Sequence, residues 1–367
     1  MKLKIMHTGD VHLGKKFNNY PSLSEELEQA RYQALENVVK QADKRGCQLL
    51  VVAGDLFDKP NLPEENIIKA VDILSKFSGE CILILPGNHD YNKIDTWEQV
   101  SKHLTGRMLL LMEGQKYDLQ KFDLDVAVYP APCDDKHSEK NVLSWIPADR
   151  ENLDRKFEIG IAHGALSGVS PDLTDAYFKM SKEELRKLNM DLWLLGHSHI
   201  SYPERAEVVN QQIFNSGTPE PDGLDCSHPG YAWYIEIDNN KNTKAERMIT
   251  GNYIFVDRSY LVNGEEDLAD MVEEICDENA ENKVVRIVIN GRIKEELYRG
   301  KNDYFQRIKN NTAYARIIDE NLNLKITKDK ISEEFTPESL PHEILQELMD
   351  DEEALQMAYE FIQEVKN

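Results

Sequence analysis

Short apolar runs recur along the N-terminal part of the chain, separated by polar or helix-forming segments. The runs are Leu3–Met6, Leu49–Ala53, Cys81–Leu85, Phe157–Ala162 and Leu192–Leu195. Their length and apolar content are typical of buried strands. Helical patterns at about 24–45 and 63–77 separate the first three runs, which predicts parallel βαβ units. A loop-rich stretch at 148–156 and a helix at about 182–188 interrupt the later runs.

A second group of β-like runs follows at residues 212–215, 231–237 and 245–249. The segment Asp238–Asn242, between the last two runs, is rich in Asn and Asp, which favour turns. It therefore predicts a β-hairpin. We expect these strands to form a second sheet that packs on the first.

The pattern changes near Gly251. Residues 253–261, 265–280 and 284–289 predict a strand, a helix and a strand, which together indicate a small α+β domain. With 367 residues, the chain is longer than one typical core, so more than one domain is expected.

Two acidic helices are predicted at the C-terminal end, at about 341–349 and 353–365, after Pro337 and Pro341. Apolar residues of the second helix lie on one stripe, which favours packing on its own domain over packing on a partner. We therefore predict three parts, at residues 1–250, 251–335 and 336–367.

The net charge of −23 argues against DNA binding by a broad basic surface. Residues 251–367 alone carry 14 Lys and Arg against 27 Asp and Glu. Bound divalent cations would add positive charge locally, and a partner subunit would be the natural source of a larger basic surface.

The cysteine content favours a reducing compartment. There are five cysteines, an odd number with no Cys-x-x-Cys pair, and Cys47 and Cys81 lie in or beside apolar runs. The stretch at the start of the sequence is too short and too polar for a signal peptide. No apolar run approaches the roughly 20 residues of a membrane helix. We expect a cytoplasmic protein that does not enter a membrane.

Seven candidate metal ligands stand directly after the apolar runs. They are Asp10, His12, Asp55, Asn88, His163, His197 and His199. Open α/β sheets place their sites at the carboxyl ends of strands, so five such coincidences in one chain indicate a shared metal site. Asp-x-His and His-x-His also put two side chains on the same side of an extended segment.

Oxygen and imidazole donors are mixed in this set, which favours manganese, iron or zinc over magnesium or calcium. Two cations roughly 3.5–4 Å apart would need a shared anion between them. Asp55, in the middle of the series, is the predicted bridging carboxylate. The set therefore predicts a hydrolase with two divalent metal ions.

These motifs resemble those of the calcineurin-like metallophosphoesterases. The longer matches Gly54–Asp58, Leu85–Asp90 and Asn215–Glu220 are similar to the SbcD-type DNA repair exonucleases, the nuclease subunits of a double-strand-break repair complex. The resemblance implies a four-layer α/β/β/α sandwich, within the α/β class, that carries a C-terminal α+β capping domain. It is specific from Asp10 to His199, extends to about residue 250 and is loose beyond.

Residue roles follow from the same resemblance. One metal would be held by Asp10, His12, His199 and the bridging Asp55. The other would be held by Asp55, Asn88, His163 and His197. His89 would face the scissile phosphate without binding metal, and Asp58 would support it. An imidazole is a natural proton donor near neutral pH.

The resemblance further implies a manganese-dependent phosphodiesterase that hydrolyses DNA as an exonuclease or endonuclease, by two-metal activation of water. It implies a coiled-coil ATPase partner of the SbcC type and a homodimer. The alternatives are a phosphomonoesterase or cyclic-nucleotide phosphodiesterase of the same superfamily, and a scaffold with a vestigial site. Protein phosphatases of this type usually carry Asp-Arg-Gly after the second motif and Asn-His-Glu in the third, whereas this chain has Leu56-Phe57-Asp58 and Asn88-His89-Asp90.

The segment Gly9–Lys16 also comes close to a phosphate-binding P-loop. Lys16 stands where that loop needs Ser or Thr, so a nucleotide-binding role is disfavoured. Lys15 and Lys16 would then either face DNA phosphates or be ordinary solvated lysines.

Overall fold

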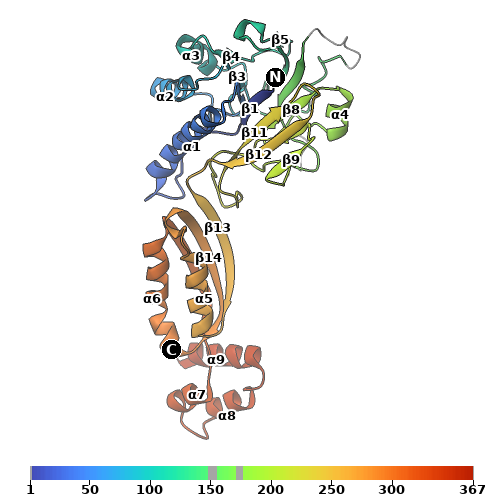
Figure 1. Cartoon of the computed structure of the whole chain (residues 1–367). Helices are drawn as coiled ribbons and strands as arrows, with labels where there is room; N and C mark the ends of the chain where they lie inside the picture. The colour runs from blue at the N-terminus through green and yellow to red at the C-terminus, as the bar shows by residue number, and fades with distance from the viewer. Residues whose placement is uncertain (1, 148–154, 171–176, 367) are drawn as a thin grey trace. The chain divides into compact units, whose positions relative to one another are not determined.

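The computed structural model describes residues 2–147, 155–170 and 177–366. The chain divides into two compact units, Met1–Phe255 and Val256–Asn367 (Figure 1). Most of the loop-rich stretch predicted at 148–156 lies outside the described residues. Among the described helices, none combines the length and apolar character needed to cross a bilayer.

The first unit contains a seven-stranded sheet in which the N-terminal strand is central. Its order is β4 (Met108–Leu110), β3 (Cys81–Leu85), β2 (Leu49–Ala53), β1 (Leu3–Thr8), β11 (Tyr231–Ile237), β12 (Thr243–Ile249) and β9 (Glu207–Val209). Strands β1 to β4 run parallel, whereas β1 pairs with β11 antiparallel. The carboxyl ends of β1, β2 and β3 therefore meet at one edge of the sheet.

A five-stranded sheet forms the second layer of β-structure. Its order is β10 (Ile213–Asn215), β8 (Leu192–Gly196), β7 (Phe157–His163), β6 (Val126–Ala131) and β5 (Tyr117–Asp118). Strands β6, β7, β8 and β10 are parallel, and β5 is antiparallel to β6. A second sheet is present, but of the three runs predicted to form it only β10 does so. Strands β11 and β12 belong to the first sheet, because β11 pairs with β1.

The two sheets pack face to face, and helices cover their outer faces. All five residues of β2 are apolar because both faces of this strand are buried. Leu49, Val51 and Ala53 enter the core between the sheets, whereas Leu50 and Val52 pack under helices. These helices are α1 (Ser24–Arg45), α2 (Glu64–Ser75) and α3 (Thr96–His103). Helix α4 (Lys182–Lys187) packs through Leu185 on the other sheet. The predicted four-layer α/β/β/α sandwich is confirmed.

The second unit has its own core on a three-stranded sheet. The strands are β13 (Ile254–Val262), β14 (Lys283–Ile293) and β15 (Tyr314–Leu324), in that order. Helices α5 (Glu265–Ile275) and α6 (Glu295–Asn311) pack on it. Three helices follow, α7 (Lys328–Glu334), α8 (Leu340–Glu347) and α9 (Glu352–Lys366), and share a small apolar cluster. The finer division at residue 335 stays a prediction.

Some elements were not predicted because they bury few apolar residues. Helix α6 buries only Phe305 and Ile308, and β15 buries only Leu322. The helix predicted at 265–280 ends at Ile275, and a short 3₁₀ turn, Ala280–Asn282, precedes β14.

Candidate metal centre

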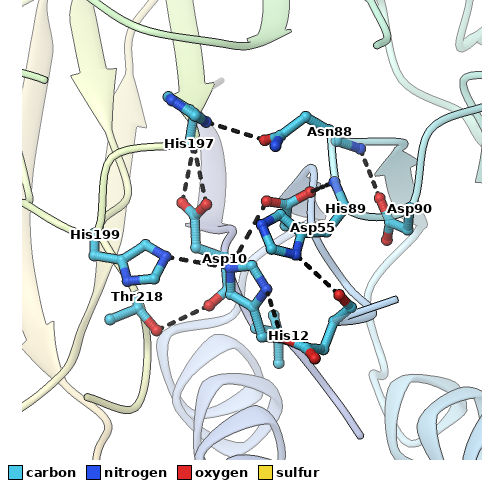
Figure 2. Close-up of polar contacts among 12 residues, drawn as sticks. Asp10, His12, Asp55, Asn88, His89, Asp90, His197, His199 and Thr218 are labelled. Carbon is cyan, nitrogen blue, oxygen red and sulfur yellow. Dashed lines mark hydrogen bonds and ion pairs between the residues drawn. The ribbon is translucent and has the colours of Figure 1, made fainter. Parts of the chain in front are cut away.

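All seven predicted ligands lie at the carboxyl ends of strands, six on the loops that follow and His163 at the last strand residue. Asp10 and His12 follow β1, Asp55 follows β2, and Asn88 follows β3. His163 ends β7, and His197 and His199 follow β8 in the other sheet. Because β2 packs against β7 and β8, the loops from the two sheets meet (Figure 2).

The backbone takes an unusual conformation at four of these positions. The φ angles are +51° at Asp10, +48° at His12, +51° at Asp55 and +101° at His197. Positive φ is uncommon for residues with a side chain and is concentrated at functional sites. The loop after β1 is held in place because the amide of Asp10 donates to the Gly54 carbonyl and that of His12 to the Asp55 carbonyl.

Glycine is required where these loops touch. A Cβ on Gly54 would lie 2.0 Å from His163 Nδ1, and a Cβ on Gly87 would lie 2.2 Å from Asp55 Oδ1. Any side chain at either position would push a ligand away. The glycines that precede Asp55 and Asn88 therefore permit the close approach of ligand side chains.

One group of ligands forms around Asp10, His12 and His199. Their donor atoms are close enough to share one cation. The Nε2 atoms of His12 and His199 lie 3.2 Å apart, and His12 Nε2 lies 3.7 Å from Asp55 Oδ2. The amide of His197 donates to both carboxylate oxygens of Asp10, at 3.1 and 3.0 Å, which fixes that side chain (Figure 2).

A second group forms around Asp55, Asn88, His163 and His197. Asn88 Oδ1 lies 3.0 Å from His163 Nε2 and 3.0 Å from His197 Nδ1. His163 Nε2 is also 3.2 Å from Asp55 Oδ2. Asp55 thus contacts ligands of both groups, through His12 on one side and His163 on the other.

The chemistry of the second group fits a bound cation. His163 Nδ1 lies 2.8 Å from the Ala53 carbonyl, so this nitrogen donates and Nε2 of the neutral ring carries a lone pair. That lone pair faces the oxygens of Asn88 and Asp55. A proton or a cation must therefore lie between the nitrogen and these oxygens. Although burial opposes it, the Asp55 carboxylate raises the pKa of His163 to about 9. Metal binding would displace this proton.

His89 lies beside this centre with one ring nitrogen already engaged. Its Nδ1 is 2.9 Å from the Asp58 carbonyl oxygen, to which it donates, so Nε2 is the ring nitrogen not used in this contact. Its ring stands edge-on to that of His12 at 4.7 Å. The support from Asp58 comes from its backbone, whereas its carboxylate lies 3.6 Å from His12 Nδ1. His89 could also share a cation with His12 and Asp55.

Asp90 has a structural role that was not predicted from the sequence. Its buried carboxylate accepts from the amides of Gly87 at 2.7 Å and Phe57 at 3.0 Å. Burial, with the nearby Asp55, raises the pKa of Asp90 to about 7. The side chain thereby ties the loop after β3 to the loop after β2. The sign of Asp90 in the sequence was its place in the segment Leu85–Asp90, one of those that carry the family resemblance.

Arg31 of α1 is another unpredicted contributor, since a helical arginine normally faces solvent. It is buried, and it donates through Nε to the Val11 carbonyl at 2.6 Å and through Nη2 to the Asp10 carbonyl at 3.2 Å. Its Nη1 reaches the Glu220 carbonyl at 3.2 Å, and Thr218 Oγ1 lies 2.8 Å from the Asp10 carbonyl. These contacts hold the loop that carries Asp10 and His12 in place.

The two lysines of the P-loop-like segment form ion pairs in this structure. Lys15 contacts Asp222 at 2.5 Å, and Lys16 contacts Glu28 at 2.6 Å. Since Asp10 and His12 of the same segment join the ligand group, the P-loop interpretation has no support here.

Comparison with known proteins agrees with this geometry. Residues 3–201 match the family model of the calcineurin-like phosphoesterases. The chain is 25% identical over 211 residues to "Uncharacterized metallophosphoesterase YhaO" of Bacillus subtilis, covering 54% of this chain and 48% of that protein.

Two further relatives match over shorter stretches. "DNA double-strand break repair protein Mre11" of Aeropyrum pernix is 36% identical over 89 residues, covering 24% of this chain and 21% of that protein. A subunit of the nuclease SbcCD of Bacillus subtilis is 33% identical over 91 residues, covering 24% of this chain and 22% of that protein. The chain thus spans less than half the length of each of these three relatives.

Proposed function

The chain belongs to the calcineurin-like phosphoesterase family, and on that premise we propose that it is a metal-dependent phosphodiesterase that hydrolyses DNA. The observation that carries the proposal is the convergence of oxygen and imidazole donors from the ends of five strands onto one small volume. The printed names of two relatives, a break repair protein and a nuclease subunit, support DNA as the substrate.

We assign the ligands to two cations. Asp10, His12 and His199 would hold one, Asn88, His163 and His197 the other, and Asp55 would contact both. Mixed nitrogen and oxygen donors support manganese, with iron or zinc as the alternatives. When bound, such a pair supplies Lewis-acid polarisation of the phosphoryl oxygens and a more acidic water nucleophile.

His89 is the residue we propose for proton transfer to the leaving oxygen. Its Nδ1 is engaged by the Asp58 carbonyl, so the ring orientation is fixed and Nε2 is directed away from that contact. The side chain is partly exposed, whereas most ligand side chains around it are buried. A substrate phosphate could therefore reach it.

A hollow beside His197 and His199 offers room for the nucleoside next to the scissile phosphate. Its volume is about 290 Å³, and its other lining residues include Tyr177, Ile200 and His228. The Tyr177 ring lies 5.1 Å from that of His197, at an interplanar angle of 32°. An aromatic ring at this distance from the centre could stack on a base, which is a sequence-tolerant contact.

An ATPase partner of the SbcC type would explain how an acidic chain engages DNA. Helices α8 and α9 leave an apolar groove of about 610 Å³ that includes Leu340, Ile344, Phe361 and Val365. Leu340 is 74% exposed, Phe361 68% and Val365 75%. We propose that a helical segment of the ATPase occupies this groove, because grooves between helices receive apolar faces of helices.

A substrate panel tests the proposed activity. The manganese-loaded chain should hydrolyse duplex DNA and bis-nitrophenyl phosphate, and mononitrophenyl phosphate much more slowly. Preference for the monoester would instead establish a phosphomonoesterase, and turnover of cyclic nucleotides alone a cyclic-nucleotide phosphodiesterase. A metal-loaded chain that is inactive on every substrate, with and without the ATPase, would establish a vestigial site.

The partner surface is tested separately with a matched pair of variants. Phe361→Asp should abolish binding to a purified SbcC-like ATPase and leave bis-nitrophenyl phosphate hydrolysis unchanged. Met357→Asp, at an equally exposed position that does not line the groove (72% exposed), is the control and should bind normally. Equal loss of binding in both variants would argue against the groove.

A further inference from the structure

Asp222 is a buried carboxylate next to the proposed centre that no motif indicated. Its side chain is 4% exposed. Oδ1 lies 3.2 Å from His199 Nδ1 and 3.4 Å from Cys226 Sγ. Oδ2 lies 2.5 Å from Lys15 Nζ. Both oxygens of the carboxylate are therefore engaged by side chains.

The contact with His199 decides which nitrogen of that ring can bind a cation. An ionised carboxylate only accepts hydrogen bonds, so Nδ1 of His199 donates to Asp222. In the neutral ring Nε2 then carries the lone pair, and it is the atom that lies 3.2 Å from Nε2 of His12. Metal-binding histidines commonly donate their other ring N–H to a carboxylate, which fixes the tautomer and the ring orientation.

Asp222 could alternatively bind a cation itself, because His199, Asp222 and Cys226 lie close enough to share one. The position of Lys15 argues against this. Its ammonium group is in contact with Oδ2, so it offsets the charge of the carboxylate and would repel a divalent cation placed there. Lys15 thus favours a supporting carboxylate over a ligand.

We propose that Asp222, paired with Lys15, is the positioning residue that fixes the tautomer of His199 and directs its Nε2 towards the cation shared with Asp10 and His12. The inference rests on the proposed metal-dependent function and adds a residue to it. It also gives Lys15 a role other than contact with DNA phosphates.

Calorimetric titration with manganese tests the proposal. Asp222→Asn keeps the size of the side chain but loses one acceptor and the charge. It should weaken one class of sites by about 10–100-fold and leave the other class unchanged. Lys16→Gln, which removes the neighbouring exposed pair with Glu28, is the matched control and should bind as the unsubstituted chain does. In a His199→Ala background, Asp222→Asn should have no additional effect.

A second measurement needs no substitution. In the zinc-loaded chain, nitrogen-15 correlation spectra should show the His199 proton on Nδ1 and none on Nε2. A proton on Nε2 would overturn the proposal, and this readout decides the matter even if Asp222→Asn does not fold.

The outcomes distinguish failure of the proposed function from failure of the role proposed for Asp222. If the unsubstituted chain binds no cation, the proposed function itself fails. If it binds two and Asp222→Asn binds them equally well, only the role of Asp222 fails. Loss of an additional, third equivalent in Asp222→Asn would make Asp222 a ligand and would also overturn the positioning role.

Discussion

The Nε2 atoms of His12 and His199 lie 3.2 Å apart, although 187 positions separate the two residues in the chain. The buried His12 ring cannot readily accept a proton, because burial lowers its pKa well below the usual value. Two ring nitrogens that face each other in this way are joined by a proton on His199 or by a cation. A cation that binds only the folded chain would also stabilise the fold.

His89→Ala should retain both metal equivalents and lose most hydrolysis. The ring has one nitrogen engaged by the Asp58 carbonyl, and seven other donors are present for the cations. Loss of acid–base assistance should lower the rate by roughly 10²–10⁴-fold. Plasma spectrometry of the purified variant gives the metal content. A missing equivalent would make His89 a ligand.

Asp55→Asn should lower metal occupancy more than Asn88→Ala does. Asp55 contacts His12 and His163, one from each ligand group, so its charge is close to both proposed cation positions. Removing it leaves the repulsion between the cations poorly offset. Calorimetric manganese titration of the two variants gives the order, and equal or reversed losses would count against a bridging role.

Removal of the second unit should spare the chemistry and reduce DNA cleavage. All proposed ligands lie before residue 200. A cut after Phe255 also keeps the amides of Asn252 and Tyr253, which donate to the buried carboxylate of Glu220 at 2.8 and 2.9 Å. Hydrolysis of bis-nitrophenyl phosphate should persist, with duplex DNA cleavage lowered.

The metal content and circular dichroism of this truncated chain serve as controls. A folded, metal-loaded truncation that cuts duplex DNA at the full rate would refute the prediction that residues 256–367 are needed for cleavage of DNA but not for the chemistry. Equal loss of both activities in such a protein would refute it as well.

Tyr177→Ala should raise KM for DNA by roughly 5–100-fold, which corresponds to the stacking of one base on an aromatic side chain. Tyr177→Phe keeps the ring and should behave as the unsubstituted chain does. DNA with an abasic terminal residue should show little dependence on Tyr177. A Tyr177→Phe variant as impaired as Tyr177→Ala would indicate that the hydroxyl, not the ring, matters.

The free energy of unfolding should decrease as the pH is lowered, because of His7. Burial lowers the pKa of this ring in β1 to about 3, from 6.5. The unfolded chain therefore binds a proton as pH falls below 6.5 while the folded chain does not. Between pH 6.5 and about 3, each unit of pH decrease lowers the free energy of unfolding by about 1.4 kcal/mol. The contribution of the neutral His7 ring to stability is fully present above pH 6.5.

His7→Phe should remove this part of the pH dependence. Urea titrations at about pH 7.5 and 5.5 compare the change in unfolding free energy for the two metal-free proteins. Tryptophan fluorescence reports on the first unit, since all four tryptophans precede residue 255. An identical change in both proteins would exclude His7 as its source.

Strands β1, β2 and β3 and helix α1 were predictable because their signals are local. Strand β2 is apolar at every position and α1 begins and ends where its pattern does, at Ser24 and Arg45. The candidate ligands were likewise marked by a repeated local arrangement, a strand followed by Asp, Asn or His. Which sheet each strand joins was not predictable, since that depends on pairing across long separations, as between β1 and β11.

The supporting residues could not be found in the same way. Arg31 looks like any helical arginine, and it becomes important only because the carbonyls of Asp10 and Glu220 come to it in the folded chain. Asp222 and Lys15 are 207 positions apart, so neither indicates the other in the sequence. Ligand residues are restricted in type by coordination chemistry, whereas many residue types can support them.

The place of β1 in its sheet has a consequence for synthesis of the chain. Strand β1 is made long before one of its two neighbours, β11, which begins only at Tyr231. Until then a central, apolar strand has an unpaired edge, which is a template for pairing with another chain. Nascent chains that stop before β11 should therefore aggregate or need a chaperone, and the first unit should become protease-resistant only once synthesis has passed residue 237.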